Sequence, residues 1–394
     1  MPSIHIFGGG MSGLTAAFLL EQQQQDYQLF ECGLHWGGKL QTTHCDGFAF
    51  DHGFQVVQSA YPALDIFHRK GYLSDALAFG SGAWLLSNKG KTLLADPLRE
   101  FPRGLAALGH PSKRLTDVVQ VVRLRNVLFN QPPEQFFTTD TTSTLQYLQN
   151  QGFSQSFIEA FFRPFFSGIF LEEALATPAS MFKFVFWALA KGKACLMPNG
   201  IQTLPNRIAA DLNPSRIHLS SHQQPQALPV VSPHKTFYST AVHYFAVDSD
   251  LGLGKFIGLN AEQQGNINLV AIPSAVQTGY APKGKHLLCV SLKPSVAAQE
   301  KTWPSPQVIL HEVDQLLQTH SQAKWLDSFT VKQALPADTA YTYKPGNDPG
   351  SIAKDIHQAE FVATGAIANP SLNAAILNGI GFVESLNSQQ ITLI

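Results

Sequence analysis

The sequence predicts an α/β fold in which a parallel β-α-β unit is built from both ends of the chain. An α+β domain with an antiparallel sheet and a helical cap is expected to be inserted into this unit. Three observations predict it. A short β run at 4–7 is followed by a glycine turn, a helical pattern up to Gln22 and a second β run at 27–31. Helical patterns dominate 61–211 and strand patterns dominate 218–331, and a last strand and helix follow at 360–365 and 370–386.

The boundaries of the predicted parts follow these changes of pattern. Helices are expected at 143–150, 154–166, 178–191 and 203–211, and strands at 236–247, 267–272 and 286–291. Segments 1–60, 196–220 and 346–394 are assigned to the parallel unit. Segment 61–195 is assigned to a mainly helical cap, and 221–345 is assigned to the antiparallel sheet.

Length and charge limit the class of protein. A chain of 394 residues predicts two or three packed units. Only 14% of the residues are charged and the net charge is −1, so the chain has no strong field with which to attract a polyanion. Nucleic acid is therefore not an expected partner.

Cysteine usage and hydropathy indicate the compartment. Cys32, Cys45, Cys195 and Cys289 are widely spaced and form no C-x-x-C pair, which argues against a zinc site and a disulfide scaffold and favours the cytoplasm. We expect no secretory signal and no transmembrane segment. The 28 phenylalanines leave peripheral contact with a membrane open, beside the simpler interpretation that they fill cores and line a pocket.

The turn after the first β run carries the pattern G-x-G-x-x-G. Its six residues are Gly8, Gly9, Gly10, Met11, Ser12 and Gly13. In a Rossmann-like fold the first glycine permits the tight turn, the second lets the backbone approach a pyrophosphate, and the third lets helix and strand pack closely. Amide groups at the helix start attract the phosphates. Glu31 ends the second strand, where it can accept hydrogen bonds from both ribose hydroxyls and would repel the 2′-phosphate of NADP.

The sequence after the second strand indicates which dinucleotide to expect. Its marked residues are Gly37, Gly38 and Lys39, followed by Asp51, His52, Gly53, Phe54 and Gln55. This stretch resembles the flavoprotein superfamily of flavin amine oxidases, protoporphyrinogen oxidases and phytoene-desaturase-like enzymes, in which Gly-Gly-Arg and then Asp-x-Gly follow the first β-α-β unit. Lys39 keeps a cation at the arginine position but not the bidentate fork. The resemblance implies FAD as the cofactor and an FAD-binding domain over 1–60, 196–220 and 346–394.

Two later parts of the chain extend the resemblance. Residues 161–171, 181–187 and 198–205 are similar to the substrate domain of plant and bacterial FAD-dependent oxidoreductases. Gly365 and the stretch 370–379, which includes Leu372 and Asn373, are similar to the flavin-contacting C-terminal segment. With Asn369 as N-cap and Pro370 in the first turn, free amides around 371–373 would stabilise the negative charge of a reduced flavin. A plain surface helix is the alternative.

The chain departs from the family pattern in two places. Gly365 is followed by Ala366, where relatives carry an aspartate that helps to hold the ribityl-phosphate region. After the expected strand at 217–219, only the polar stretch 220–234 precedes the next strand, so several dozen residues of the nucleotide domain are absent relative to the family. Both departures lower the affinity for FAD that the resemblance implies.

The resemblance implies that the flavin carries the redox chemistry, so no catalytic base is required. Candidate substrate-pocket residues are Gln55, Arg163 and Phe166, and further candidates for the pocket wall are Phe54, Phe161, Phe162, Phe170, Phe182, Phe184, Phe186 and Trp187. Helical spacing makes core packing the alternative for each. Arg163 is suited to clamp a substrate carboxylate or to form a structural ion pair. The histidines show no metal-ligand spacing, so no metal is expected.

Three functions compete at this point. The leading hypothesis is an FAD-dependent oxidase or desaturase for an apolar amine, polyene or porphyrin-like substrate, with O2 or a quinone as electron acceptor. The second is an NAD-dependent dehydrogenase, which leaves Gly37, Gly38 and the C-terminal segment unexplained. The third is a catalytically silent relative that keeps the fold for binding, which Ala366 and the shortened middle favour.

Overall fold

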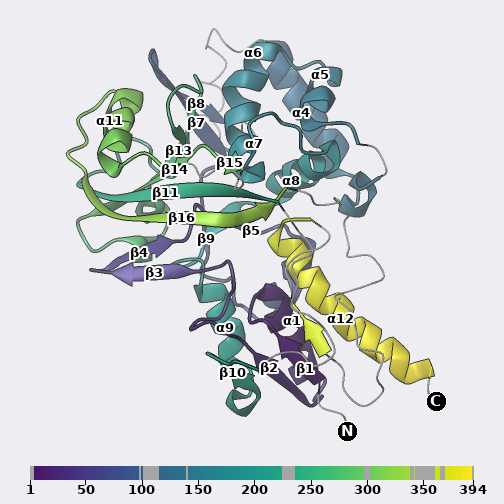
Figure 1. The fold of residues 1–394 in the computed structure, drawn as a ribbon. Helices are drawn as coiled ribbons and strands as arrows, with labels where there is room; N and C mark the ends of the chain where they lie inside the picture. The colour runs from purple at the N-terminus through teal and green to yellow at the C-terminus, as the bar shows by residue number, and fades with distance from the viewer. Residues whose placement is uncertain are drawn as a thin grey trace.

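The computed structural model contains a four-stranded and an eight-stranded sheet, two smaller sheets, and helices that pack on the two main sheets (Figure 1). The described residues are 4–96, 99–100, 115–138, 141–223, 236–296, 302–337, 341, 360–363 and 369–392. Gly365, Ala366 and most of the shortened stretch 220–234 lie outside them.

The smaller sheet is parallel and joins the two ends of the chain. Its strands lie in the order β10-β2-β1-β17, with bounds β1 Ile4–Phe7, β2 Tyr27–Phe30, β10 Ile217–His218 and β17 Glu360–Val362. His5 pairs with both Gln28 of β2 and Glu360 of β17. The predicted β-α-β unit and the predicted last strand are therefore confirmed as neighbours in one sheet.

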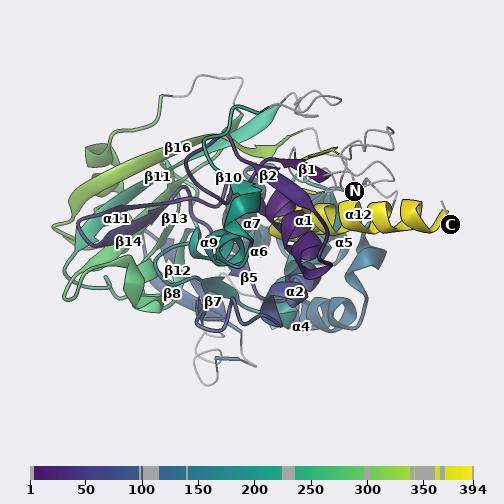
Figure 2. The same ribbon diagram turned by 90° about the horizontal axis from the view of Figure 1, so that it is seen from below.

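Alternation along β1 and β2 separates the two faces of this sheet. Ile6 and Leu29 are fully buried against three helices. These are α1 Met11–Gln22, α9 Thr203–Ala210 and α12 Leu372–Thr392. Figures 1 and 2 show α1 and α12 side by side although they come from opposite ends of the chain. On the opposite face, Phe7 stacks on Phe30 and Phe30 on His218.

The larger sheet has eight strands and is mostly antiparallel. Its order is β15-β11-β14-β13-β12-β7-β8, with β16 also paired to β11. The bounds are β7 Gly82–Ser87, β8 Gly90–Ala95, β11 Phe237–Val247, β12 Ile257–Asn260, β13 Ile267–Ala271, β14 His286–Leu292, β15 Ser295–Val296 and β16 Lys324–Pro336. Helix α11, Pro306–Leu317, packs Ile309 and Val313 on this sheet.

A second group of helices, which we call the helical layer, packs beside the larger sheet (Figure 1). Its elements are α4 Leu115–Phe129, the 3-10 turn Pro133–Phe136, α5 Thr144–Asn150, α6 Gln155–Phe157, a π-helical segment Ile158–Phe162, α7 Arg163–Phe170 and α8 Ala179–Lys191. Ser143 and Ser154 cap α5 and α6 by accepting hydrogen bonds from backbone amides. The π segment ends just before Pro164, which cannot donate to the preceding helical turn.

Short elements connect these layers. They are the hairpin β3 Thr42–Cys45 with β4 Phe48–Asp51, the small sheet of β5 Val57–Gln58, β9 Ala194–Leu196 and β6 Leu77–Ala78, the short helices α2 Asp65–His68 and α10 Pro273–Val276, and the 3-10 turns Pro62–Leu64, Pro214–Arg216 and Thr278–Tyr280. No helix among the described residues has the length and hydropathy needed to cross a bilayer.

The observed elements differ in detail from two expectations. Within 61–195, which was expected to be mainly helical, β7 and β8 form a hairpin that joins the larger sheet through parallel pairing of β7 with β12. The turn between these two strands separates two apolar runs, and Gly90, which follows it, has φ +110°. Both features are typical of a hairpin. The last helix begins at Leu372 and continues past the predicted end at 386.

Candidate functional site

The first glycine turn is built from contacts that leave no room for side chains. Gly8 has φ +108°, and a Cβ on Gly13 would lie 1.9 Å from the carbonyl oxygen of Gly8. Strand and helix therefore touch backbone to backbone, as predicted for the third glycine. Helix α1 starts after Gly10 without a capping side chain and without an acidic residue in its first turn. Its positive end can therefore receive an anion.

The second glycine turn lies directly against the first. The N–H of Gly37 donates to the carbonyl oxygen of Gly9 at 2.8 Å, and Gly10 and Gly37 form a parallel bridge. A Cβ on Gly38 would lie 3.2 Å from the Cα of Gly10. Gly38 itself is exposed, so the two turns form an open glycine-lined surface at the start of α1. The Nζ of Lys39 donates to the carbonyl oxygen of Ala334 at 3.0 Å on β16.

Glu31 connects the end of β2 with the first turn. Its Oε2 accepts from the N–H of Gly9 at 2.6 Å and its Oε1 accepts from the N–H of Gly33 at 2.6 Å. The carboxylate is thereby held beside the glycine turn. Oε1 also accepts a weak hydrogen bond from the Cys32 thiol at 3.5 Å, whereas Oε2 keeps a further lone pair for another donor such as a sugar hydroxyl.

The C-terminal helix contacts the N-terminal unit at two points. A Cβ on Gly379 would lie 2.4 Å from the carbonyl oxygen of Ser12, so α12 approaches α1 closely. The Oδ1 of the fully buried Asn373 accepts from the N–H of Ala63 at 3.0 Å, while its Nδ2 has no hydrogen-bond partner in the described structure. A buried amide donor without a partner is costly, and a ligand can satisfy it.

The predicted cap of this helix is wrong by two residues. The N–H of Ala374 donates to the hydroxyl of Ser371 at 3.1 Å, so Ser371 and not Asn369 is the capping residue. Asn369 instead accepts a hydrogen bond from the Ser371 hydroxyl. Pro370 precedes the helix and is not in its first turn.

The segment after β4 lies next to the second glycine turn. Gly53 has φ +102°. The Nε2 of Gln55 donates to the carbonyl oxygens of Lys39 at 3.0 Å and His52 at 2.9 Å. Gln55 thus links this segment to Lys39, while the ring of Phe54 packs against that of Phe79. Residues that the sequence pattern placed in one site are therefore neighbours in space.

Arg163 and Phe166 lie elsewhere, in the helical layer. The guanidinium of Arg163 forms two hydrogen bonds to the carboxylate of Glu159, at 2.6 and 2.8 Å, and a third to the carbonyl oxygen of Glu173. Phe166 is fully buried, with its ring centroid 4.7 Å from that of Phe182. These contacts favour the structural ion pair and the core alternative. Phe162, Phe182 and Phe184 are also fully buried.

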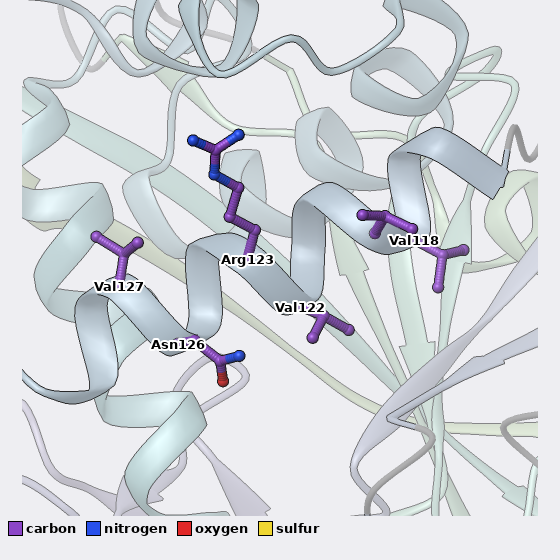
Figure 3. Close-up of a pocket in the computed structure, with 6 residues that line it drawn as sticks. Val118, Val122, Arg123, Asn126 and Val127 are labelled. Carbon is purple, nitrogen blue, oxygen red and sulfur yellow. The ribbon is translucent and has the colours of Figure 1, made fainter.

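A hollow of about 460 Å³ lies along α4 (Figure 3). Its lining is formed by Val118, Val119, Val122, Arg123, Asn126 and Val127. All six belong to a single helix that packs on α8, whereas the glycine turns adjoin α1 and α12. The hollow is therefore a surface feature of the helical layer and includes none of the predicted site residues.

Sequence reasoning missed the residues that hold the second turn in position. Trp36 covers Gly9, where a Cβ would lie 2.5 Å from the indole ring. Gln202 donates to the carbonyl oxygen of Trp36 at 3.3 Å and accepts from the N–H of Thr42 at 2.9 Å. No short motif joins these positions, so spacing along the chain gave no signal.

Comparison with known proteins agrees with this geometry. Residues 11–222 match the sequence profile of the family described as "Flavin containing amine oxidoreductase". The chain belongs to this family. The predicted resemblance is thereby confirmed, and membership in this flavin-containing family implies FAD as the cofactor.

Relatives at the sequence level match a short part of the chain. A 4,4'-diaponeurosporene oxygenase of Staphylococcus aureus strain Mu50 is 34% identical over 73 residues, which are 18% of this chain and 15% of that protein. The protein of the same name in Staphylococcus haemolyticus is 35% identical over 65 residues, 16% of this chain and 13% of that protein. The matched stretches thus span less than a sixth of these relatives.

Solved structures with a similar fold cover nearly the whole chain. A putative protoporphyrinogen oxidase from Exiguobacterium sp. 255-15 is 16% identical with a TM-score of 0.67 and covers 98% of this chain and 99% of its own. Putrescine oxidase bound to putrescine is 13% identical with a TM-score of 0.61, covering 98% and 99%. Reduced UDP-galactopyranose mutase is 12% identical with a TM-score of 0.63, covering 98% and 96%. The predicted α/β fold with an FAD-binding domain and an inserted domain is confirmed.

The described residues fit FAD at the glycine turns. The bare surface at Gly10 and Gly38 leaves room for a pyrophosphate beside the start of α1, Glu31 offers acceptors for a ribose, and Asn373 offers a buried donor. A Cβ at Gly38 would narrow this surface.

Proposed function

We propose that this chain is an FAD-dependent oxidoreductase that oxidises a largely apolar organic substrate. The observation that carries the proposal is the meeting of three remote segments. The turns at Gly10 and Gly38 contact each other, and helix α12, from the other end of the chain, packs on the helix α1 that begins at the first turn. Because the chain belongs to a flavin-containing family, we assign FAD to this meeting point.

The chain's own groups have distinct parts in the proposed site. The first amides of α1 bind the pyrophosphate, because they point out of an uncapped helix start. Glu31 accepts from the adenosine ribose while Gly9 and Gly33 hold it in place. Asn373 and the start of α12 orient the redox end and stabilise negative charge there. When bound, FAD supplies the acceptor for a hydride or for electrons.

The substrate class is proposed as apolar, and the oxidant as O2 or a quinone. The names of the similar proteins include an oxygenase, oxidases and a mutase, so similarity of fold does not choose among reactions. The low charge of the chain supports an apolar substrate. Gln55, beside the second turn, is the pocket residue that we propose first. All four cysteines are free thiols, which supports the proposed cytoplasmic location.

Absorption spectroscopy of the purified protein tests the cofactor. We expect near-ultraviolet and blue flavin bands, either as purified or after addition of FAD. Anaerobic bleaching of these bands by amines, polyenes or tetrapyrroles then tests oxidation and its substrate. Protein that stays colourless with excess FAD contradicts the proposal and leaves the dehydrogenase and the silent relative, which NAD binding separates.

Comparison of FAD with FMN makes this test specific to the proposed site. FMN lacks the adenosine that Glu31 is proposed to bind. Glu31→Gln should therefore weaken FAD about tenfold and leave FMN affinity nearly unchanged, since one ion-assisted hydrogen bond is worth about 1.5 kcal/mol. Titration of flavin fluorescence in both proteins gives the two dissociation constants. Equal losses for the two flavins would contradict the role of Glu31.

A further inference from the structure

Asp51, at the end of β4, has a buried carboxylate that joins several remote segments. The residue is 3% exposed. Its Oδ1 accepts from the hydroxyl of Thr42 at 2.6 Å and from the N–H of Ile201 at 2.9 Å. Its Oδ2 accepts from the hydroxyl of Tyr280 at 2.6 Å. The backbone oxygen of Asp51 also accepts from Tyr244 of the larger sheet at 2.8 Å.

A chain of hydrogen bonds leads from this carboxylate to the second glycine turn. The Thr42 hydroxyl that donates to Asp51 also accepts from the N–H of Gln202 at 3.1 Å. Gln202 in turn donates to the carbonyl oxygen of Trp36 at 3.3 Å, directly before Gly37. A Cβ on Gly37 would lie 2.6 Å from the carbonyl oxygen of Leu40 and 2.8 Å from Pro205. The turn therefore has little freedom to shift independently of this network.

The charge of Asp51 costs stability rather than supplying it. The described partners of its carboxylate are hydroxyl groups and an amide, with no ion pair among the described residues. Burial raises its pKa to about 6. The pKa of Asp51 in the folded protein is above that of an unfolded aspartate. Protonation of its carboxyl therefore stabilises the fold at low pH, and this stabilisation is lost as the pH rises from about 4 to about 6. An asparagine would remove the charge, but its amide group would face one of the three donors that Asp51 now accepts from.

We propose that Asp51 is a positioning residue for the FAD site, which fixes the second glycine turn against the first and ties it to the larger sheet. This inference rests on the proposed function. Ionised Asp51 holds the Thr42 hydroxyl in one orientation, so that the oxygen of Thr42 faces Gln202. Gln202 then fixes the backbone at Trp36 and Gly37, and Tyr280 and Tyr244 connect the same carboxylate and its backbone to the inserted domain.

The other titratable groups around Asp51 stay uncharged near neutral pH. Burial raises the pKa of Tyr280 and of Tyr244, and it also raises the pKa of the Cys289 thiol. The neighbouring His52 directs its ring to the Thr43 hydroxyl and stacks on Phe329. Burial lowers the pKa of His52 from its ordinary value of 6.5, but its ring lies outside the hydrogen bonds that join Asp51 to the second glycine turn. Loss of the pH dependence of FAD affinity in Asp51→Asn is therefore what assigns that dependence to Asp51.

Flavin titration of matched variants tests the inference. In Asp51→Asn and in Thr42→Val we expect the dissociation constant for FAD to rise at least about tenfold, a loss typical when an orienting partner is removed. The midpoint of thermal unfolding of the flavin-free Asp51→Asn protein at pH 7 separates a loss of stability from a loss of FAD affinity. Tyr280→Phe should have a smaller effect on FAD, because the branch through Thr42 remains. The control Thr144→Val removes a buried hydroxyl of the helical layer, and it should lower the unfolding midpoint without changing FAD affinity.

A pH series separates positioning from a merely structural role. FAD affinity of the wild-type protein should fall between pH 7 and pH 5 as Asp51 becomes protonated, and this dependence should be absent in Asp51→Asn. If Asp51→Asn and Thr42→Val bind FAD as tightly as the wild type, the inference is wrong while the proposed function stands. A wild-type protein that binds no FAD at any pH contradicts the proposed function itself.

Discussion

The parallel-sheet unit and the helical layer achieve close packing in different ways. In the parallel-sheet unit, backbones meet where side chains are missing, as at Gly13 against Gly8 and at Gly379 against Ser12. In the helical layer, phenylalanine rings fill the space, as in the pair of Phe166 with Phe182. A bare backbone offers amides and room to a cofactor, whereas interlocked rings offer neither. The difference locates the proposed chemistry beside the glycines and not within the aromatic cluster.

The largest expected effect is a loss of stability when a ring of the aromatic cluster is truncated. Phe166→Ala should lower the free energy of unfolding by about 3–5 kcal/mol, because a fully buried ring is lost and a cavity remains. The FAD dissociation constant of the remaining folded protein should not change. Chemical denaturation and flavin titration measure the two quantities, and Phe166→Leu, at about 1 kcal/mol, provides a milder variant. Loss of FAD affinity in the milder variant would place Phe166 at the site.

An intermediate effect is expected on the glycine side, where α12 provides its own control. Gly379→Ala should cost about 1–3 kcal/mol, because its Cβ meets the carbonyl oxygen of Ser12 and must push α12 from α1. FAD affinity should fall with it. Gly381→Ala, two residues along the same helix, meets no atom within 4 Å and should gain up to about 1 kcal/mol. Thermal unfolding and flavin titration of the pair test this; equal behaviour would refute the close approach.

The smallest effect concerns Arg163. Hydrogen bonding to Arg163 lowers the pKa of Glu159, so the stabilisation from this pair is present above the ordinary carboxyl pKa and is lost as the pH falls through the lowered one. Glu159 is partly exposed, so Arg163→Met should cost at most about 1 kcal/mol at pH 7 and less at pH 3. Urea unfolding at both pH values measures this. An increase in KM at unchanged stability would instead indicate that Arg163 binds a substrate carboxylate.

Local features of the site could be predicted from the sequence, whereas features that depend on remote contacts could not. The requirement for glycine at Gly8 and Gly13 is set within one turn, so spacing alone revealed it. An ion pair of Arg163 was expected as one of two alternatives, and its partner proved to be Glu159, four residues earlier in the chain. Asp51 was not singled out as a site residue, since its partners Thr42, Ile201 and Tyr280 are scattered over much of the chain. Their meeting depends on the tertiary fold.

The pairing of β1 with β17 has a consequence for biosynthesis. Strand β1 at 4–7 is translated long before its partner β17 at 360–362. This edge of β1 therefore stays unpaired until β17 has been made, and the surface that α12 covers on α1 stays open as well. A site that includes α12 is therefore complete only after the C-terminal helix has been made, and until then β1 presents an unpaired strand edge.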